Sequence, residues 1–384
     1  MEGFSFYMPT KIVFEKDALD SVAEHAKDFG KIGLLITDKM MLETDIVKRV
    51  RKSLDKENMD YLIWSDIVPN PRDKDIEKGA EFAIENKIDY LIAVGGGSAI
   101  DTAKAIGAIM TNGGCCRDLY GNKLTKPIAP LIAIPTTCGT GSEVTHESIV
   151  NNTTTMVKDC IWGPNNSVKV AILDPDVLAK LPAHIMGSTG MDALTHAVEA
   201  YVGKAANPLT DALALSAISM IGKSLIKGVN EKNTEDLENM LVASCMAGAA
   251  FGNSDVASVH SIAEALGGYY DIPHGVANAM MLPEVSRLSV PGAPKKYAAV
   301  AKALGVDVSG MSTDEAAYAG VDYIQEMADT LKIPHFCDLE CVDPKDFDRL
   351  AKTAAEAPET ADNPVMMYQE DFKALFERLY NEKG

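Results

Sequence analysis

The sequence lacks a cysteine framework. Its 384 residues include only seven cysteines, an odd number, and no two of them form a C-x-x-C pair. A small domain held together by disulfides is therefore excluded. The pattern is typical of reduced thiols, so we expect a cytoplasmic protein.

Long hydrophobic runs are also missing. The first residues, MEGFSFYMPTKIVF, lack the charged region and the apolar stretch of a secretory signal, and no later run reaches membrane-spanning length. We therefore expect the apolar segments to form a protein core, and we expect no membrane partner.

Positive charge is scarce. Lysine and arginine number 36 against 55 aspartates and glutamates, which gives a formal net charge of −19. The resulting field repels anionic polymers, so nucleic acid is a poor partner and small molecules are the expected ligands. With 47% hydrophobic residues the chain can bury a sizeable core, and its length predicts two domains.

Strand and helix patterns alternate up to about Pro182. The apolar runs KIGLLITD, MDYLIWSD, IDYLIAVGGGS, APLIAIPTT and VKVAILDP are typical of strands, whereas IVKRVRKSL, IEKGAEFAIEN and AIDTAKAIGAIM have helical spacing. This alternation predicts a parallel sheet in a dinucleotide-type α/β domain, which we place at residues 1–183.

Beyond Pro182 the strand patterns disappear. Stretches rich in Ala, Leu, Met and Glu recur at helical spacing, among them MDALTHAVEAYV, TDALALSAISMIGKSLIKGV and SVHSIAEALGGYY. We expect residues 184–384 to form an all-helical domain. No internal repeat or Gly/Ser linker occurs, so the connection between the domains should be short.

A glycine run follows one of the predicted strands. Gly95, Gly96, Gly97 and Ser98 come directly after it, and Asp101 lies in the first turn of the next helix. Backbone without side chains lets a phosphate approach, and a helix N-terminus supplies free N–H groups. The run is not G-x-G-x-x-G, so the usual dinucleotide fingerprint is absent and a plain tight turn stays an alternative.

A second loop of small residues follows the strand LIAIP. Thr136, Thr137, Thr140 and Ser142 lie in the segment TTCGTGSE, which is dense in hydroxyl donors. Two such loops at strand ends indicate one shared phosphate-bearing ligand. The alternative is a capping segment in which Ser142 and Glu143 begin a helix.

Asp38 ends the strand KIGLLITD. A doubly wound sheet typically places there the acid that hydrogen-bonds an adenosine ribose. A carboxylate would repel the 2′-phosphate of NADP, so Asp38 favours NAD(H), although a turn residue or a helix cap is the alternative. Lys158 can offer a cation to the nicotinamide-side ribose or phosphate, or it lies solvated at the surface.

Three histidines and an aspartate in the second half carry the chemistry of a metal site. Asp192 and His196 are four residues apart, so one helix face presents both, while His260 begins a second helical segment and His274 precedes another. Three imidazoles and one carboxylate suit a divalent transition metal such as Fe²⁺ or Zn²⁺. From spacing alone, the alternative that each histidine is a core or capping group stays open.

Four segments together carry a family resemblance. GGGSAID, PTTCGTGSE, GMDALTHAVEAY and PHGVANAMMLP resemble the iron-containing (group III) alcohol dehydrogenases, and the match extends over essentially the whole chain. The resemblance implies an N-terminal Rossmann-like α/β domain and an all-α C-terminal domain, the dehydroquinate synthase-like fold.

The resemblance also implies roles for individual residues. The family's four metal ligands fall on Asp192, His196, His260 and His274. Its nucleotide contacts fall on Asp38, Asn70, Gly97, Ser98, Asp101, Thr136, Thr137, Thr140 and Lys158.

The chain departs from the family pattern at Glu264. Many members carry a histidine four residues after the third ligand, near the nicotinamide and the substrate. An acid there changes proton handling and substrate preference, so we count Glu264 among the candidate catalytic residues. The alternative is an outward-facing helical glutamate, although its i,i+4 partner His260 should face the metal. Phe251 and Val256 are further candidates for the substrate pocket.

The function implied by the resemblance is a metal-dependent NAD(H) oxidoreductase. It would interconvert a small primary alcohol and its aldehyde, with the metal polarising the substrate oxygen during hydride transfer. Fe²⁺ is the expected metal and Zn²⁺ the alternative. A glycerol or polyol dehydrogenase of the same superfamily and a non-catalytic nucleotide-binding protein are the competing functions. Relatives commonly form dimers, so we expect a homo-oligomer.

Overall fold

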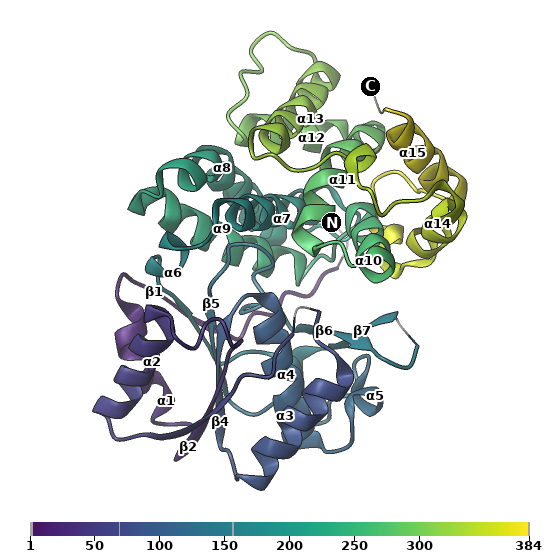
Figure 1. Ribbon diagram of the computed structural model, residues 1–384. Coiled ribbons are helices and arrows are strands. Elements are labelled where there is room, and N and C mark those ends of the chain that lie inside the picture. The colour runs from purple at the N-terminus through teal and green to yellow at the C-terminus, as the bar shows by residue number, and fades with distance from the viewer. Residues whose placement is uncertain (1–2, 69, 156, 383–384) are drawn as a thin grey trace. The chain divides into compact units, whose positions relative to one another are not determined.

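The structure is a computed structural model that describes residues 3–68, 70–155 and 157–382. It divides into two compact units (Figure 1). The α/β unit comprises Tyr7–Thr137 and Gly141–Leu181, and the helical unit comprises Met1–Phe6, Cys138–Thr140 and Pro182–Gly384. The division into functional domains after residue 183 stays a proposal.

A six-stranded parallel sheet forms the centre of the α/β unit, with the strand order β1-β8-β5-β4-β2-β3. Its strands are β1 (Lys11–Phe14), β2 (Ile32–Ile36), β3 (Asp60–Trp64), β4 (Tyr90–Gly95), β5 (Leu131–Pro135) and β8 (Val170–Leu173). Every residue of β4 and β5 is buried. Central strands of a parallel sheet are covered on both faces, which explains why their sequences are continuous apolar runs.

Helices lie on both sides of this sheet. α1 (Val22–Ala26) and α2 (Asp45–Lys56) lie on one side, and α3 (Asp73–Glu85) and α4 (Gly97–Asn112) lie on the other (Figure 1). Leu34 and Leu91 of the sheet share one buried cluster with Ile76 of α3 and Ile106 of α4. Each such side chain stabilises the fold by about 1.5–3 kcal/mol when it leaves water.

The strand order reverses between β2 and β4. The chain runs from β2 outward to its neighbour β3, and later from β4 in the opposite direction to β5. Open α/β sheets bind ligands at such a reversal, beyond the carboxyl ends of the strands. Asp38 and the glycine run follow these two strands, so the topology places both at this edge.

Two features of the α/β unit go beyond the predicted strands. The edge strand β1 and the antiparallel hairpin of β6 (Glu147–Asn152) and β7 (Val157–Trp162) were not expected. β6 alternates buried and half-buried residues, and its sequence ESIVNN has only two aliphatic residues. The sequence of β6 alone therefore does not predict a strand, and the strand becomes evident only from its pairing with β7.

The second half of the chain is helical, as predicted. Its main helices are α7 (Ala183–Val202), α8 (Pro208–Glu231), α9 (Thr234–Phe251), α10 (Ser258–Tyr270), α11 (His274–Ser289), α12 (Pro294–Ala303), α13 (Thr313–Thr330), α14 (Phe347–Glu356) and α15 (Gln369–Asn381). No strand occurs among residues 182–382. α7 packs against α8, α9 and α11 and is buried almost all round, which explains why its sequence has so few charges.

Helix α8 is the one helix of the described ranges that is long and apolar enough to cross a membrane. It packs against α7 and α9, and its buried residues Ala214, Ala217, Ile218, Ile221 and Leu225 recur at helical spacing. Such a one-sided stripe is typical of a helix in a protein core. None of the seven cysteines, all of which lie in the described ranges, forms a disulfide.

Candidate functional site

Helix α7 carries two of the predicted metal ligands on one face. Asp192 and His196 are only 3% and 2% exposed. His196 Nδ1 lies 2.8 Å from the carbonyl oxygen of Asp192 and donates to it, which fixes the tautomer and leaves the lone pair on Nε2. The helix itself therefore orients this imidazole.

Helices α10 and α11 supply the other two histidines. His260 lies in the first turn of α10, and His274 is the first residue of α11. A Cβ added at Gly275 would lie 3.0 Å from the carbonyl oxygen of Ser188 and 3.4 Å from Cβ of Asp192. Glycine at this position thus lets α11 begin directly against α7.

The four side chains converge. One ligand atom from each of Asp192, His196, His260 and His274 lies within 4.8 Å of the other three. His196 Nε2 is 3.0 Å from His260 Nε2, and His274 Nε2 is 3.9 Å from Asp192 Oδ1. The structure therefore brings together all four residues that the sequence analysis proposed as ligands.

The donor set fits a divalent cation. Glu199 Oε2 lies 2.5 Å from His260 Nδ1, and its other oxygen accepts from the backbone N–H of Val259 at 2.7 Å. With Nδ1 donating to Glu199, His260 directs its Nε2 lone pair at the lone pair of His196. Two lone pairs 3.0 Å apart repel each other unless a cation or a proton lies between them.

Burial and neighbouring charges set the protonation of this cluster. Burial lowers the pKa of His196 to about 4, so this imidazole is neutral at neutral pH. Burial also opposes charging of His260, but the Glu199 carboxylate outweighs it and raises the pKa of His260 above its ordinary value. For Asp192, burial acts to raise the pKa, whereas the histidines and Asn278 hold that pKa below its usual range.

Two polar residues of the cluster were missed in the sequence analysis. Glu199 is only 3% exposed, and Asn278 is fully buried with Nδ2 2.7 Å from Asp192 Oδ1. Helical spacing was the available signal, because Glu199 follows His196 by three residues and Asn278 follows His274 by four. Spacing alone does not show which of many polar residues on a helix points inward.

Two of the candidate substrate-pocket residues, Phe251 and Glu264, lie close to the ligand set. The ring of Phe251 packs on His196 with 4.3 Å between centroids. The charge of Glu264 acts to raise the pKa of His260. Burial first, and the Glu264 carboxylate second, raise the pKa of Glu359 to about 8. Val256 is half-buried in the turn before α10.

The glycine run and the first two residues of the second loop, Thr136 and Thr137, lie side by side in the α/β unit. Gly96 is the N-cap of α4, which begins at Gly97, so Asp101 lies beyond the first turn, in which it was expected. The backbone N–H of Thr136 donates to the carbonyl oxygen of Gly95 at 3.0 Å, and a Cβ added at Gly96 would lie 3.2 Å from Thr137 Oγ1. Gly96, Gly97 and Ser98 are half-buried, so a ligand can reach the helix N-terminus.

The other predicted nucleotide residues have varied surroundings. Asp38 Oδ1 accepts from the backbone N–H groups of Met40 and Met41, at 2.8 and 3.0 Å, so Asp38 caps a turn, and its contact with a ribose stays a prediction. Asn70 has a left-handed φ of 56°. Lys158 is half-buried on β7, opposite Asn151. Thr140 belongs to the helical unit.

A buried lysine links the second loop to α4. Lys104 is fully buried, and its Nζ donates to Ser142 Oγ, Thr145 Oγ1 and the carbonyl oxygen of Glu147 at 3.2, 3.1 and 2.8 Å. Ser142 Oγ donates in turn to Asp101 Oδ1 at 2.5 Å. Asp101 and Ser142 thus hold the loop in place. Their direct contact with a nucleotide stays a prediction.

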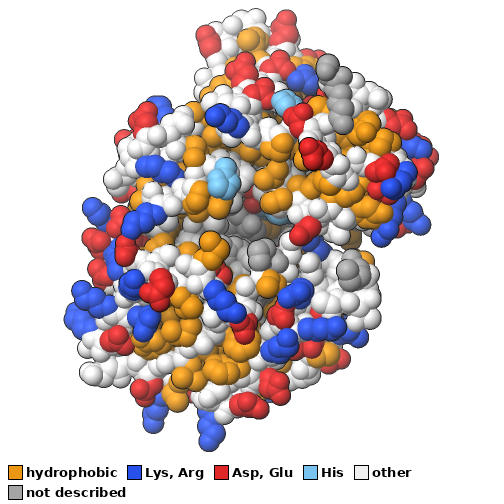
Figure 2. Space-filling model, in the orientation of Figure 1, with side chains coloured by type: hydrophobic (Ala, Val, Ile, Leu, Met, Phe, Trp, Pro, Cys, Tyr) orange, Lys and Arg blue, Asp and Glu red, His pale blue; other side chains and the backbone are white. Residues whose placement is uncertain are grey.

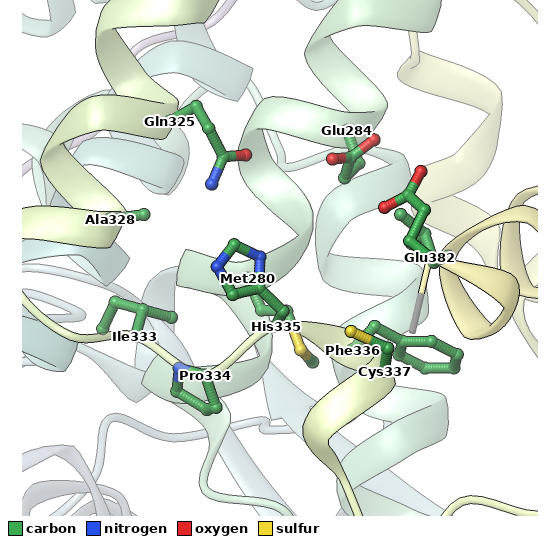
Figure 3. A pocket seen from close by; sticks show the side chains of 11 residues that line it. Met280, Glu284, Gln325, Ala328, Ile333, Pro334, His335, Phe336, Cys337 and Glu382 are labelled. Atoms are coloured by element: carbon green, nitrogen blue, oxygen red, sulfur yellow. The ribbon is translucent and has the colours of Figure 1, made fainter. Parts of the chain in front are cut away.

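A separate pocket occurs in the helical unit. Met280 and Glu284 of α11, Gln325 of α13 and the segment around His335 line it (Figure 3). None of the predicted site residues is among the residues that line this pocket. We therefore do not assign the predicted chemistry to it.

Comparisons with known proteins cover both units. The family model "Iron-containing alcohol dehydrogenase" matches residues 9–175, and "Fe-containing alcohol dehydrogenase family, C-terminal" matches residues 186–380. A 1,3-propanediol dehydrogenase from Citrobacter freundii is 37% identical over 98% of this chain and 99% of its own. An NAD-dependent methanol dehydrogenase from Bacillus methanolicus is 36% identical over 97% and 98% of the two chains.

The fold is that of a solved relative. The crystal structure of a 1,3-propanediol oxidoreductase superposes with a TM-score of 0.96 at 37% identity, covering 98% of this chain and 100% of the other. The predicted fold class, a Rossmann-like α/β part followed by an all-helical part, is confirmed. The chain is an NAD-dependent alcohol dehydrogenase or aldehyde reductase, and it belongs to the iron-containing alcohol dehydrogenase family.

Proposed function

We propose that this enzyme interconverts a small primary alcohol and its aldehyde at a divalent metal held by Asp192, His196, His260 and His274. The convergence of four ligand atoms within 4.8 Å of one another is the observation that carries the proposal. Iron is the proposed metal, in keeping with the family, and Zn²⁺ is the alternative that this donor set also accepts. When bound, the metal supplies a Lewis acid for the substrate oxygen, and NAD supplies the hydride acceptor.

The surrounding residues orient the ligands and exclude water. Glu199 holds His260 through Nδ1, and the Asp192 carbonyl holds His196 through Nδ1, so both Nε2 atoms face the same point. The ring of Phe251 covers one side of His196. We propose that the proton of the alcohol passes to water or to the carboxylate of Glu264 during oxidation and returns by the same route during reduction.

We assign the nucleotide to the carboxyl-end edge of the sheet. Gly96, Gly97 and Ser98 would hold the pyrophosphate together with Thr136 and Thr137, because both loops offer backbone N–H groups or hydroxyls next to a helix N-terminus. Asp38 would accept from the adenosine ribose and favour NAD over NADP. Asn70, Asp101, Thr140, Ser142 and Lys158 complete the proposed set.

The substrate class follows from the relatives. The names of the two curated relatives specify 1,3-propanediol and methanol, both small primary alcohols. A glycerol or polyol dehydrogenase is the second candidate, which a panel of short aldehydes and polyols with NADH or NAD⁺ separates. Preference for a secondary alcohol of a polyol over every primary alcohol would contradict the proposal.

Metal analysis of a ligand variant tests the metal site. We expect His274→Ala to lose bound metal and NADH-dependent aldehyde reduction together. His335→Ala is the matched control, because this side chain is 58% exposed and lies outside the ligand set. Full activity of metal-free His274→Ala would overturn the proposal, and an inactive variant that retains its metal would place His274 outside the ligand set.

We further propose a homodimer without nucleic acid or membrane partners, located in the cytoplasm. β1 is an edge strand of the sheet, and its residues Ile12 and Phe14 are 39% and 44% exposed. An apolar edge strand is a template for pairing with a second chain. On the face seen in Figure 2, lysine and arginine side chains are scattered among acidic ones. A surface that binds nucleic acid would instead gather its basic side chains in one patch. Light scattering of the wild type and an Ile12→Lys variant tests the dimer.

A further inference from the structure

Asn278 occupies an unusual position among the predicted ligands. Its Nδ2 lies 2.7 Å from Asp192 Oδ1, 3.0 Å from His260 Nε2 and 3.2 Å from His274 Nε2. The residue is fully buried in α11, and its Oδ1 has no hydrogen-bond partner within the described ranges. One amide nitrogen therefore touches three of the four side chains that would hold the metal.

Chemistry fixes which way the amide faces. A carboxylate oxygen and two imidazole nitrogens surround Nδ2, and all three can accept hydrogen bonds. Turning the amide over would place Oδ1 against the same three acceptors, with repulsion in place of attraction. The orientation with NH₂ toward the ligands is therefore the favourable one.

The amide cannot keep all three contacts when a metal is bound. The nitrogen carries two hydrogens, and an imidazole Nε2 has a single lone pair, which a metal would take. A carboxylate oxygen has more than one lone pair, so Asp192 can accept from Asn278 and ligate at the same time. When a metal binds, Asn278 therefore loses its contacts to His260 and His274 and keeps its contact to Asp192.

We infer that Asn278 is a positioning residue of the metal centre. Before the metal arrives, its two N–H groups hold ligand lone pairs that would otherwise repel each other, so the three side chains stay gathered. After the metal arrives, its remaining bond keeps the carboxylate of Asp192 in orientation. The inference rests on the proposed metal site and assigns a role to a residue outside the ligand set.

The direction of the effect distinguishes positioning from competition. Outer partners of metal ligands typically change metal affinity by about 10–100-fold when they are removed. If Asn278 positions the ligands, removing it weakens binding by that amount. If its N–H groups mainly compete with the metal for lone pairs, removing it strengthens binding.

Titration of metal-free protein with Co²⁺ tests the inference. Asn278→Leu keeps the volume of the side chain and removes its donors, and Asn278→Ala is a second variant should leucine not fold. Asn363→Ala is the matched control, because this residue of the same unit is also a buried asparagine, 2% exposed, whose Nδ2 donates to Ser289 Oγ and the Val365 carbonyl oxygen at 2.9 and 2.7 Å.

We expect both Asn278 variants to fold without metal and to bind Co²⁺ about 10–100-fold more weakly than wild type. The control should bind like wild type. Equal or tighter binding by the Asn278 variants, with normal binding by wild type, overturns this inference and leaves the proposed function intact. Failure of the wild type itself to bind divalent metals would overturn both.

Discussion

The carboxylate of Glu199 accepts a hydrogen bond from His260 Nδ1 at 2.5 Å, and both residues are almost fully buried. This pair joins α7 to α10 and selects the tautomer of His260 that presents Nε2 to the other ligands. Glu199 therefore acts on the proposed metal through another residue, without belonging to the ligand set.

Replacing Glu199 by glutamine should weaken metal binding by about 10–100-fold, because the amide no longer stabilises the imidazole or raises its basicity. A chelator competition with the purified protein measures the change. Asp236→Asn, which alters another buried carboxylate of the helical unit, is the control. Unchanged affinity in Glu199→Gln would mean that the helices alone orient His260.

Metal affinity should fall as the pH is lowered from neutrality. The raised pKa of His260 means that it takes a proton at a higher pH than an ordinary histidine, and this proton must leave before Nε2 can bind a metal. His196, whose pKa burial lowers to about 4, does not compete in this range.

We therefore expect the logarithm of the dissociation constant to change with pH by at least one proton per metal between roughly pH 5 and neutrality. In Glu199→Gln the onset should move to lower pH, because the carboxylate that raises the pKa of His260 is gone. A slope near zero would contradict this assignment.

Lys104→Met should destabilise the α/β unit. The buried ammonium donates to three oxygens and lies 3.9 Å from Asp101 Oδ1, so its removal leaves a carboxylate without its cation. Breaking a buried pair in this way costs roughly 3–5 kcal/mol of unfolding free energy. Urea unfolding measures the loss, and Lys78→Met, at a lysine that is 67% exposed, should change little.

Lys104→Met should also raise KM for NAD⁺ more than it lowers kcat, because the loop after β5 loses the hydrogen bonds that connect it to α4. Steady-state kinetics below the unfolding temperature test this point. An unchanged KM would separate the lysine from the proposed nucleotide loop.

Glu264→Gln should relax discrimination against anionic substrates. Thr360 Oγ1 donates to Ser261 Oγ at 2.7 Å and ties the turn η6 (Pro358–Asp362) to α10, so Glu359 lies near Glu264 beside the ligand set. Removing one negative charge should raise the ratio of kcat/KM for a carboxylated aldehyde over a neutral one by roughly tenfold.

Glu235→Gln, at a glutamate that is 71% exposed on α9, controls for the change in net charge. If the ratio stays the same in Glu264→Gln, the carboxylate lies too far from the bound substrate to influence it. Loss of turnover with every aldehyde would instead support the proton-transfer role proposed above.

Much of the fold could be predicted because the central strands are buried on both faces. Runs such as IDYLIAVG need no partner to be recognised, and helices such as α2 and α3 bury one face at helical spacing. β1 and β8 pair across more than 150 residues of chain, through Lys11 and Val170. VKVAILDP was recognised as a strand, but the pairing itself depends on the whole sheet and leaves little trace in the short segment of β1.

The ligand set could be predicted for a different reason. Asp192 and His196 share a helix face, and the family motifs supplied the two histidines from other helices. Glu199 and Asn278 could not be found in this way, because their roles depend on where α10 and α11 cross α7. A polar residue on a helix becomes an orienting partner only when its neighbour in space is known.

The segment Cys138–Thr140 belongs to the helical unit, although the residues on either side of it belong to the α/β unit. Ser244 Oγ of α9 donates to the carbonyl oxygen of Gly139 at 2.9 Å. In a chimera that takes residues 182–384 from a different family member, α9 would therefore come from one protein and the contacting tripeptide Cys138–Thr140 from the other. Chimeras of this family should tolerate such a single crossover only when the tripeptide is exchanged as well.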